Sequence, residues 1–318
     1  MTASANPAAP QTPGIAVLEE RRKPDSLMKI AGRRFLRHRM AVFGVILMGL
    51  ILAYVTVPAF FFTETFANNV DVSRRFQAPS MQHFFGTDEV GRDVFVRTVW
   101  GGQISLAIGI TSVLISITLG TLVGLTAGYF GGWIDSLLMR FVEAMLSIPT
   151  LILLLMLQRV LIGNTATMNV LGRQISVTVV AIVMIIGLTG WMGLSRIVRS
   201  MVLSLKEQEF VVAARTLGAN NLRIIFVHIL PNTVAPIVVS ATLAVGGAII
   251  IETALGFLGF GVQPPTATWG NILSRARERM NDVWWLWLAP GVLIMLTVLA
   301  INFIGDGLRD AFDPRSKQ

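Results

Sequence analysis

Six runs of about 20 mostly apolar residues limit the folds that this chain can adopt. A helix rises 1.5 Å per residue, so about 20 apolar residues cross the roughly 30 Å hydrocarbon core of a bilayer. The runs are Ala41–Phe62, Ile104–Ala127, Ser136–Leu157, Val177–Ser195, Thr233–Ile251 and Trp284–Ile304. We therefore predict an all-α polytopic membrane protein with six transmembrane helices.

The third run differs from the other five because it contains charged residues. Arg140 and Glu143 are three residues apart, so we expect them to pair on one face of the helix. Pro149 lies inside the same run and is expected to kink it.

The composition argues against a soluble protein. Charged residues make up 14% of the 318 positions, against about 25% in a typical soluble domain. Helices buried in a large soluble core would need more polar surface than this to cover them. The chain has no Cys and three widely spaced His, so we expect no disulfide, no metal site and no Cys nucleophile.

The Lys and Arg residues predict the orientation, because basic loops stay on the cytoplasmic side of a membrane. With both termini cytoplasmic, 17 of the 26 basic residues fall on that side. They flank spans and do not form a stripe with aromatic residues, so we expect contact with the lipid bilayer and none with nucleic acid.

The predicted spans divide the chain into five parts. We expect residues 1–25 to form a disordered cytoplasmic tail, and residues 26–62 to form a basic amphipathic segment and the first transmembrane helix. Residues 63–103 form an extracytoplasmic loop. Residues 104–306 form the transmembrane core with a cytoplasmic loop at 196–231, and residues 307–318 form a cytoplasmic tail.

Three glycines in the second run share one helix face. Gly120, Gly124 and Gly128 recur every four residues and make a flat ridge for close helix packing. The sequence leaves open whether the partner helix belongs to this chain or to another subunit.

The cytoplasmic loop predicts two short helices separated by a break. A helix over Lys206–Leu217 has acidic residues early and Arg215 late, which suits the helix dipole. Gly218 is expected to adopt the left-handed conformation that ends a helix, and Asn220 or Asn221 to cap the next one. Pro231 then falls in the first turn of the fifth span.

Two adjacent alanines lie in the middle of the first short helix. The small side chains of Ala213 and Ala214 would let another surface approach the backbone closely. The alternative is ordinary packing against the spans of the same chain.

The order Glu-x-x-x-Ala-Ala-x-x-x-Gly, with Ile-Leu-Pro twelve residues later, resembles the EAA loop of binding-protein-dependent ABC importer permeases. The resemblance implies that Glu209–Gly218 forms a coupling helix that docks on a separate ATPase subunit. The residues implied in this coupling are Glu209, Ala213, Ala214, Arg215, Gly218, Leu230 and Pro231.

Three further stretches look like the second permease subunit of dipeptide, oligopeptide and nickel importers: Phe85–Phe95, Glu252–Gly270 and Pro290–Pro314. The resemblance implies a type I ABC importer permease in a bacterial inner membrane. It also implies three kinds of partner: a second permease subunit, two ATPase subunits and an extracytoplasmic substrate-binding protein. Peptides are the leading substrate, and the sequence does not separate them from oligosaccharides or nickel complexes.

No Gly-x-x-x-x-Gly-Lys-Ser/Thr motif occurs, so we expect no nucleotide site and no cofactor on this chain. ATP and Mg would bind to the partner ATPases, and this subunit would not itself be an enzyme. An ion-coupled secondary transporter is the rival hypothesis, but it would need carboxylates deep in the bilayer. Here the carboxylates near the membrane lie close to span ends.

One carboxylate stands beside a glycine-rich break after the fifth span. Glu252 is followed by Gly256, Gly259 and Gly261, and these four residues are the candidates for a gate or pathway. In the alternative interpretation, Glu252 only accepts hydrogen bonds from backbone N–H groups freed by the broken helix.

Overall fold

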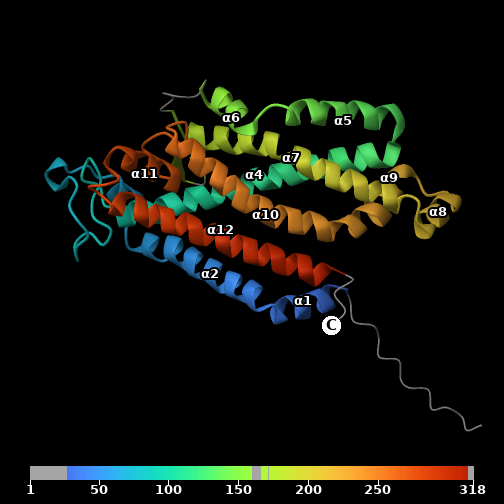
Figure 1. Ribbon diagram of the computed structural model, residues 1–318, viewed down its shortest axis with the longest axis horizontal. Coiled ribbons are helices and arrows are strands. Elements are labelled where there is room, and N and C mark those ends of the chain that lie inside the picture. Colours follow the sequence, from blue (N-terminus) through green and yellow to red (C-terminus); the bar gives the residue numbers. More distant parts are fainter. Residues whose placement is uncertain (1–26, 160–165, 171, 314–318) are drawn as a thin grey trace, which may run out of the picture.

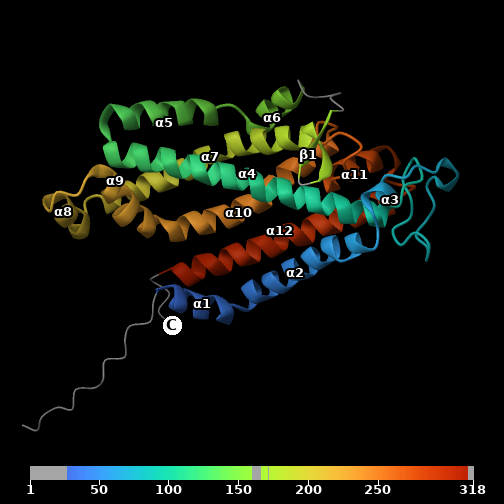
Figure 2. The same ribbon diagram turned by 180° about the vertical axis from the view of Figure 1, so that it is seen from behind.

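The computed structural model describes residues 27–159, 166–170 and 172–313; the predicted tail at 1–25 lies outside these ranges. Long helices run roughly along one axis (Figures 1 and 2). We name the two ends of the helix bundle after the short helices that lie there. The α8 end holds α8 (Glu209–Thr216), and the α11 end holds α11 (Trp269–Ala276).

Among the described residues, five helical segments are long and apolar enough to cross a membrane. They contain α2 (Arg39–Thr56), α4 (Val94–Phe130), α7 (Val177–Leu205), α10 (Leu230–Phe257) and α12 (Trp285–Phe312). Several extend well past the predicted spans. The helix α4 begins ten residues before Ile104, because the Asp93 side chain accepts the N–H of Val96 and caps the helix there.

The third predicted span, Ser136–Leu157, is a bent pair of helices. α5 (Gly132–Leu146) and α6 (Thr150–Arg159) meet at an angle of 79°. If the two helices together form one span, the described residues contain six candidate spans. The break falls at residues 147–149, where Pro149 disfavours helix at Ile148 and has no N–H to donate. The kink is confirmed at its predicted place. The expected pairing of Arg140 with Glu143 is wrong, since the described residues show no such ion pair.

The packing of α4 on α7 forms the core of the bundle. Gly124 faces α7 so closely that a Cβ there would lie 2.7 Å from the carbonyl oxygen of Ser195. Gly120 and Gly128 make equivalent approaches one turn away on either side. The glycine ridge therefore packs within this chain, which resolves the alternative that the sequence left open.

Helices from the two halves of the chain pack side by side. α1 (Leu27–Arg37) and α2 lie along α12, and Gly44 and Gly307 permit this approach because neighbouring atoms leave no room for a Cβ at either. The helix α10 lies between α12 and the α4–α7 pair (Figure 1). The helix α12 continues to Phe312, so the first residues of the predicted tail at 307–318 are helical. Both α1 and the end of α12 lie toward the α8 end (Figure 1).

The loops at the α11 end form a compact cap. α3 (Glu64–Ala67) and the hairpin of β1 (Thr167–Val170) and β2 (Arg173–Ser176) belong to it, with short 3₁₀ turns at 58–60, 72–74 and 277–279. Thr167 pairs with Ser176 across the antiparallel hairpin. Arg173 joins the hairpin to α3 through two hydrogen bonds to Glu64, at 2.7 and 3.0 Å.

Candidate functional site

The segment between α7 and α10 projects from the α8 end of the molecule (Figure 1). The helix α7 runs unbroken to Leu205, so the first ten residues of the predicted loop at 196–231 belong to a long helix. The helix α8 covers Glu209–Thr216, which is shorter than the predicted Lys206–Leu217 but holds the same centre.

The break between the two short helices forms as the sequence predicts. Gly218 has φ +85°, a left-handed conformation that side chains rarely adopt. Asn220 accepts the N–H of Arg223 at 2.8 Å and caps α9 (Asn221–Arg223). Pro231 lies in the first turn of α10, directly after Leu230.

A π-helical stretch over Ile224–Ile229 leads from α9 into α10, and no pattern in the sequence indicated it. It contributes three fully or nearly fully buried isoleucines to the core: Ile224, Ile225 and Ile229. The extra residue per turn places Phe226 and Val227 on the exposed side.

The helix α8 is fixed to the bundle by one side. Val211 is fully buried in a cluster with Ile224, Ile229 and Val202 of α7. The hydroxyl of Tyr129, at the end of α4, donates to Asn221 Oδ1 at 2.8 Å. The short helix is therefore attached to the ends of α4, α7 and α10 and would move with them.

Residues 209–229 form an elbow made of α8, α9 and the π-helical stretch. The side of this elbow that faces away from the bundle presents apolar side chains to the surroundings. The exposed ones are Phe210, Val212, Leu217, Leu222, Phe226 and Val227, and we call them the elbow surface. Leu217 is 88% exposed. Ala213 is exposed and Ala214 is half-buried among them, while Glu209 and Arg215 add charge. Exposed apolar clusters of this kind occur at contacts with another protein or with a membrane. Leu222, Phe226 and Val227 lie in the helical segment Asn221–Phe257, which is long and apolar enough to span one.

The second group of predicted residues lies at the α11 end. Glu252 is fully buried, and its Oε2 accepts the hydroxyl of Ser105 on α4 at 3.1 Å. Ser105 Oγ in turn accepts the backbone N–H of Trp269, the first residue of α11, at 3.1 Å. The carboxylate thus connects α10, α4 and α11, three elements that are distant in sequence.

The glycines beside Glu252 shape the turn from α10 to α11. A Cβ at Gly256 would lie 2.6 Å from the backbone of Gly270, so only glycine permits this approach. Gly261 packs against Gly256 in the same way, and Gly259 turns the chain with φ +86°. Gly256, Gly259 and Gly261 line a small pocket with Arg275 and Asn271.

Sequence reasoning missed Ser105 and Trp269. Trp269 is fully buried and its Nε1 donates to the carbonyl of Thr98 at 2.9 Å. Ser105 lies in an apolar run with several other Ser and Thr residues, so its partner could not be found from spacing. In the part of the chain that the structure describes, no group of three or more His, Asp and Glu could hold a metal ion.

Family comparisons agree with this architecture. Residues 120–318 match the model of the family described as "binding-protein-dependent transport system inner membrane component". Residues 26–79 match the N-terminal transmembrane domain of oligopeptide transport permease C. The chain belongs to this permease family. It is therefore a multi-pass transport subunit of the ABC importer type.

Several relatives cover nearly the whole permease. A putative peptide permease protein of Brucella suis is 44% identical over 293 residues, covering 91% of this chain and 92% of the relative. The oligopeptide transport system permease protein OppC of Haemophilus influenzae is 42% identical, covering 92% and 90%. The dipeptide transport system permease protein DppC of Alkalihalophilus pseudofirmus is 40% identical, covering 99% of both.

One solved structure shows the same fold. A chain of the MetNI methionine ABC transporter, in an inward-facing conformation, superposes with a TM-score of 0.51 at 22% identity. The match covers 69% of this permease and 96% of that chain. The type I importer fold that the sequence predicted is confirmed.

Proposed function

We propose that this permease is one of two membrane subunits of an ATP-driven peptide importer. A separate pair of ATPase subunits binds at the α8 end, and a substrate-binding protein delivers peptides at the α11 end. The permease binds no nucleotide itself; ATP and Mg act on the ATPases. Motion of the docked ATPases is transmitted to the bundle and moves its helices as rigid bodies.

The elbow surface is the observation that carries this proposal. Its side chains are apolar and exposed although the segment behind them is rigidly packed through Val211. Burying such side chains in a partner's groove stabilises a complex by roughly 25 cal/mol per Å² of apolar area. In this proposal the contact is formed by Glu209, Ala213, Ala214, Arg215 and Gly218, and the motion reaches α10 at its first residues, Leu230 and Pro231.

Peptides are the substrate class that the relatives support, because the oligopeptide and dipeptide permeases are 40–42% identical over 90% or more of their length. The bundle itself offers mostly apolar, small and hydroxyl side chains, which suits loose recognition with selectivity in the binding protein. Oligosaccharides and nickel complexes are alternative substrates that an uptake assay separates from peptides.

Glu252 and the neighbouring glycines have a gating role in this proposal. The Ser105–Glu252 contact ties α4 to α10 beside the first residue of α11. A change in the angle between these helices would break the contact and release α11. Gly256, Gly259 and Gly261 give the turn the close packing that this movement requires.

The proposed orientation follows from the distribution of basic residues. We place the α8 end and both termini in the cytoplasm and the α11 end outside the inner membrane of a bacterium. Basic residues at 29–37 on α1 would then contact anionic headgroups of the inner leaflet.

The test replaces one side chain of the elbow surface by a charge. Leu217→Asp leaves the packing of the bundle intact, since Leu217 is 88% exposed. In the complex of both permeases, both ATPases and the binding protein, we expect it to lower ATPase co-purification and ATP-dependent peptide uptake by about tenfold or more.

The matched control is Met81→Asp. Met81 is also apolar and 91% exposed, and it lies in the loop cap at the other end of the molecule. This variant should retain its ATPases. Unchanged co-purification of ATPases with Leu217→Asp would contradict the proposed docking site, and peptide uptake driven by an ion gradient without ATPases would favour a secondary transporter.

A further inference from the structure

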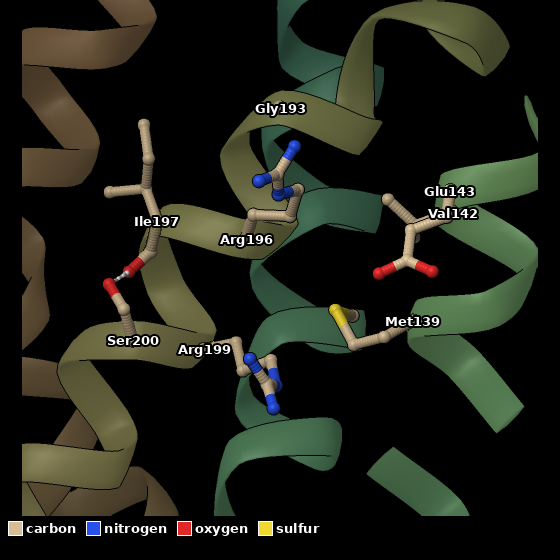
Figure 3. Close-up of a pocket in the computed structure, with 8 residues that line it drawn as sticks. All are labelled: Met139, Val142, Glu143, Gly193, Arg196, Ile197, Arg199 and Ser200. Atoms are coloured by element: carbon tan, nitrogen blue, oxygen red, sulfur yellow. Dashed lines mark hydrogen bonds between the residues drawn. The ribbon is translucent and has the colours of Figure 1, made fainter. Parts of the chain in front are cut away.

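A charged cavity of about 500 Å³ lies between α5 and α7 (Figure 3), and α7 leads from it toward α8. Its wall includes Val142 and Glu143 of α5 and Gly193, Arg196, Arg199 and Ser200 of α7. The volume falls in the range of small-molecule sites, roughly 300–1,000 Å³.

The two arginines of the cavity are in different states. Arg199 donates two hydrogen bonds to Asp135 of α5, one of them from Nη2 to Oδ2 at 2.6 Å. Its charge is therefore balanced by a fixed carboxylate. Arg196, one turn earlier on α7, has no ion pair or side-chain hydrogen bond within the described residues.

A carboxylate without a hydrogen-bonded partner lies on the facing wall. Glu143 projects from α5 toward the cavity, opposite the α7 side chains (Figure 3). Neither Glu143 nor Arg196 is bonded to the other in the described part of the chain. The cavity thus presents Arg196 and Glu143 on facing walls, both exposed toward its opening, and Glu143 also interacts electrostatically with Arg199.

Charges of opposite sign on facing walls, neither held in an ion pair within the described residues, are complementary to a zwitterion. A short peptide has an ammonium group at one end and a carboxylate at the other, separated by about 3.3–3.6 Å per residue. Arg196 offers a planar fork that matches a carboxylate, and Glu143 accepts hydrogen bonds from an ammonium. Gly193 adds no side chain to the α7 wall one turn before Arg196, and a Cβ there would meet no atom within 4 Å.

We propose that this cavity is a transit site for the charged termini of the transported peptide, with Arg196 binding its carboxylate and Glu143 its ammonium group. The inference rests on the proposed peptide import and assigns a site within that function. The position of the cavity supports it, because α7 leads through residues 206–208 directly to α8. A movement of α8 therefore changes the distance between Arg196 and Glu143, so that the site holds peptide in one conformation and releases it in another.

The test uses the absence of cysteine from this chain. Ser200→Cys places one thiol in the wall of the cavity, and Ser204→Cys places a matched thiol one turn further along α7, exposed and outside the cavity. The complex is reconstituted without nucleotide, and the rate of modification by a soluble maleimide is measured with and without tri-alanine.

Tri-alanine should slow modification of Ser200→Cys at least fivefold and leave Ser204→Cys unchanged. N-acetyl-tri-alanine amide, which lacks both charges, should not protect. Adding Arg196→Gln or Glu143→Gln to the Ser200→Cys protein should remove the protection by tri-alanine. Glu143→Gln keeps the size of its side chain, Arg196→Gln keeps a polar amide, and each removes one charge.

Equal protection by the charged and the blocked peptide would overturn this inference, and so would protection that survives both glutamine variants. Protection by phosphatidylethanolamine vesicles in place of tri-alanine would assign the site to a lipid headgroup and overturn it as well. In each case ATP-dependent peptide uptake by the unmodified complex would still uphold the proposed function. Absence of that uptake would instead refute the proposed function.

Discussion

Asp88 organises the loop cap at the α11 end through a buried ion network. Its Oδ1 accepts the backbone N–H groups of Val90 and Arg92 at 3.0 and 2.9 Å, and its Oδ2 accepts Arg92 Nε at 2.7 Å. Arg97 Nε lies 3.9 Å from the same carboxylate. Asp88, Arg92 and Arg97 are all buried, so their charges depend on one another.

We predict that Asp88→Ala lowers the free energy of unfolding by about 3–5 kcal/mol, because it leaves buried guanidinium groups without their carboxylate. Thermal unfolding of the purified complex measures the effect. Asp71→Ala is the control: Asp71 is half-buried, caps a single turn through Ser73 and pairs with the exposed Arg74, so its loss should have a much smaller effect. Equal losses in the two variants would contradict the role of the network.

Conformations and hydrogen bonds that depend on residues nearby in the sequence could be predicted. Hydrogen bonds between residues far apart in the sequence could not. The left-handed Gly218 and the Asn220 cap depend on neighbours within three residues, so the sequence displays their cause. Ser105 and Glu252 are 147 positions apart, and nothing in either neighbourhood identifies the other. The predicted pair of Arg140 and Glu143 failed because Glu143 faces the cavity beside α7 instead.

At the scale of elements, the ends of the helices were the least predictable feature. An apolar window finds only the part of a helix that lies in lipid. Asp93 caps α4 ten residues before the predicted start at Ile104, whereas α7 begins at Val177 as predicted but continues past Ser195 to Leu205. The sequence predicted that the glycine ridge of α4 packs closely against another helix. Only the fold shows that this helix is α7.

The connection between α8 and α9 tests whether the elbow must be rigid. Gly218 has φ +85°, and a Cβ added there would meet no atom within 4 Å, so a substitution acts through the backbone and not through a clash. Gly218→Val should lower peptide-stimulated ATP hydrolysis about fivefold or more, because a β-branched residue strongly disfavours positive φ.

Gly218→Asn is the matched variant for this experiment. Asparagine is similar in size to valine but adopts the left-handed conformation several-fold more readily than most residues. We expect it to keep most of the stimulated hydrolysis. A similar loss in both variants would mean that the conformation of residue 218 does not matter for coupling.

At the scale of the whole molecule, the bundle has two specialised ends joined by helices of 28 to 37 residues. The α11 end is capped by packed loops with buried charges, and the α8 end presents the elbow surface. The fold class and the family were predictable because hydropathy and several long motifs agreed. The charged cavity between α5 and α7 was not, since its walls come from residues about 50 positions apart that only the fold brings together.

Site-specific cross-linking from position 217 tests whether the elbow surface docks on an ATPase subunit. A photoreactive amino acid at this position, in intact cells that produce the whole complex, should form an adduct with an ATPase subunit. The same amino acid at position 81 should form none with that subunit. Adducts of position 217 with an extracytoplasmic protein, or with lipid alone, would contradict the account.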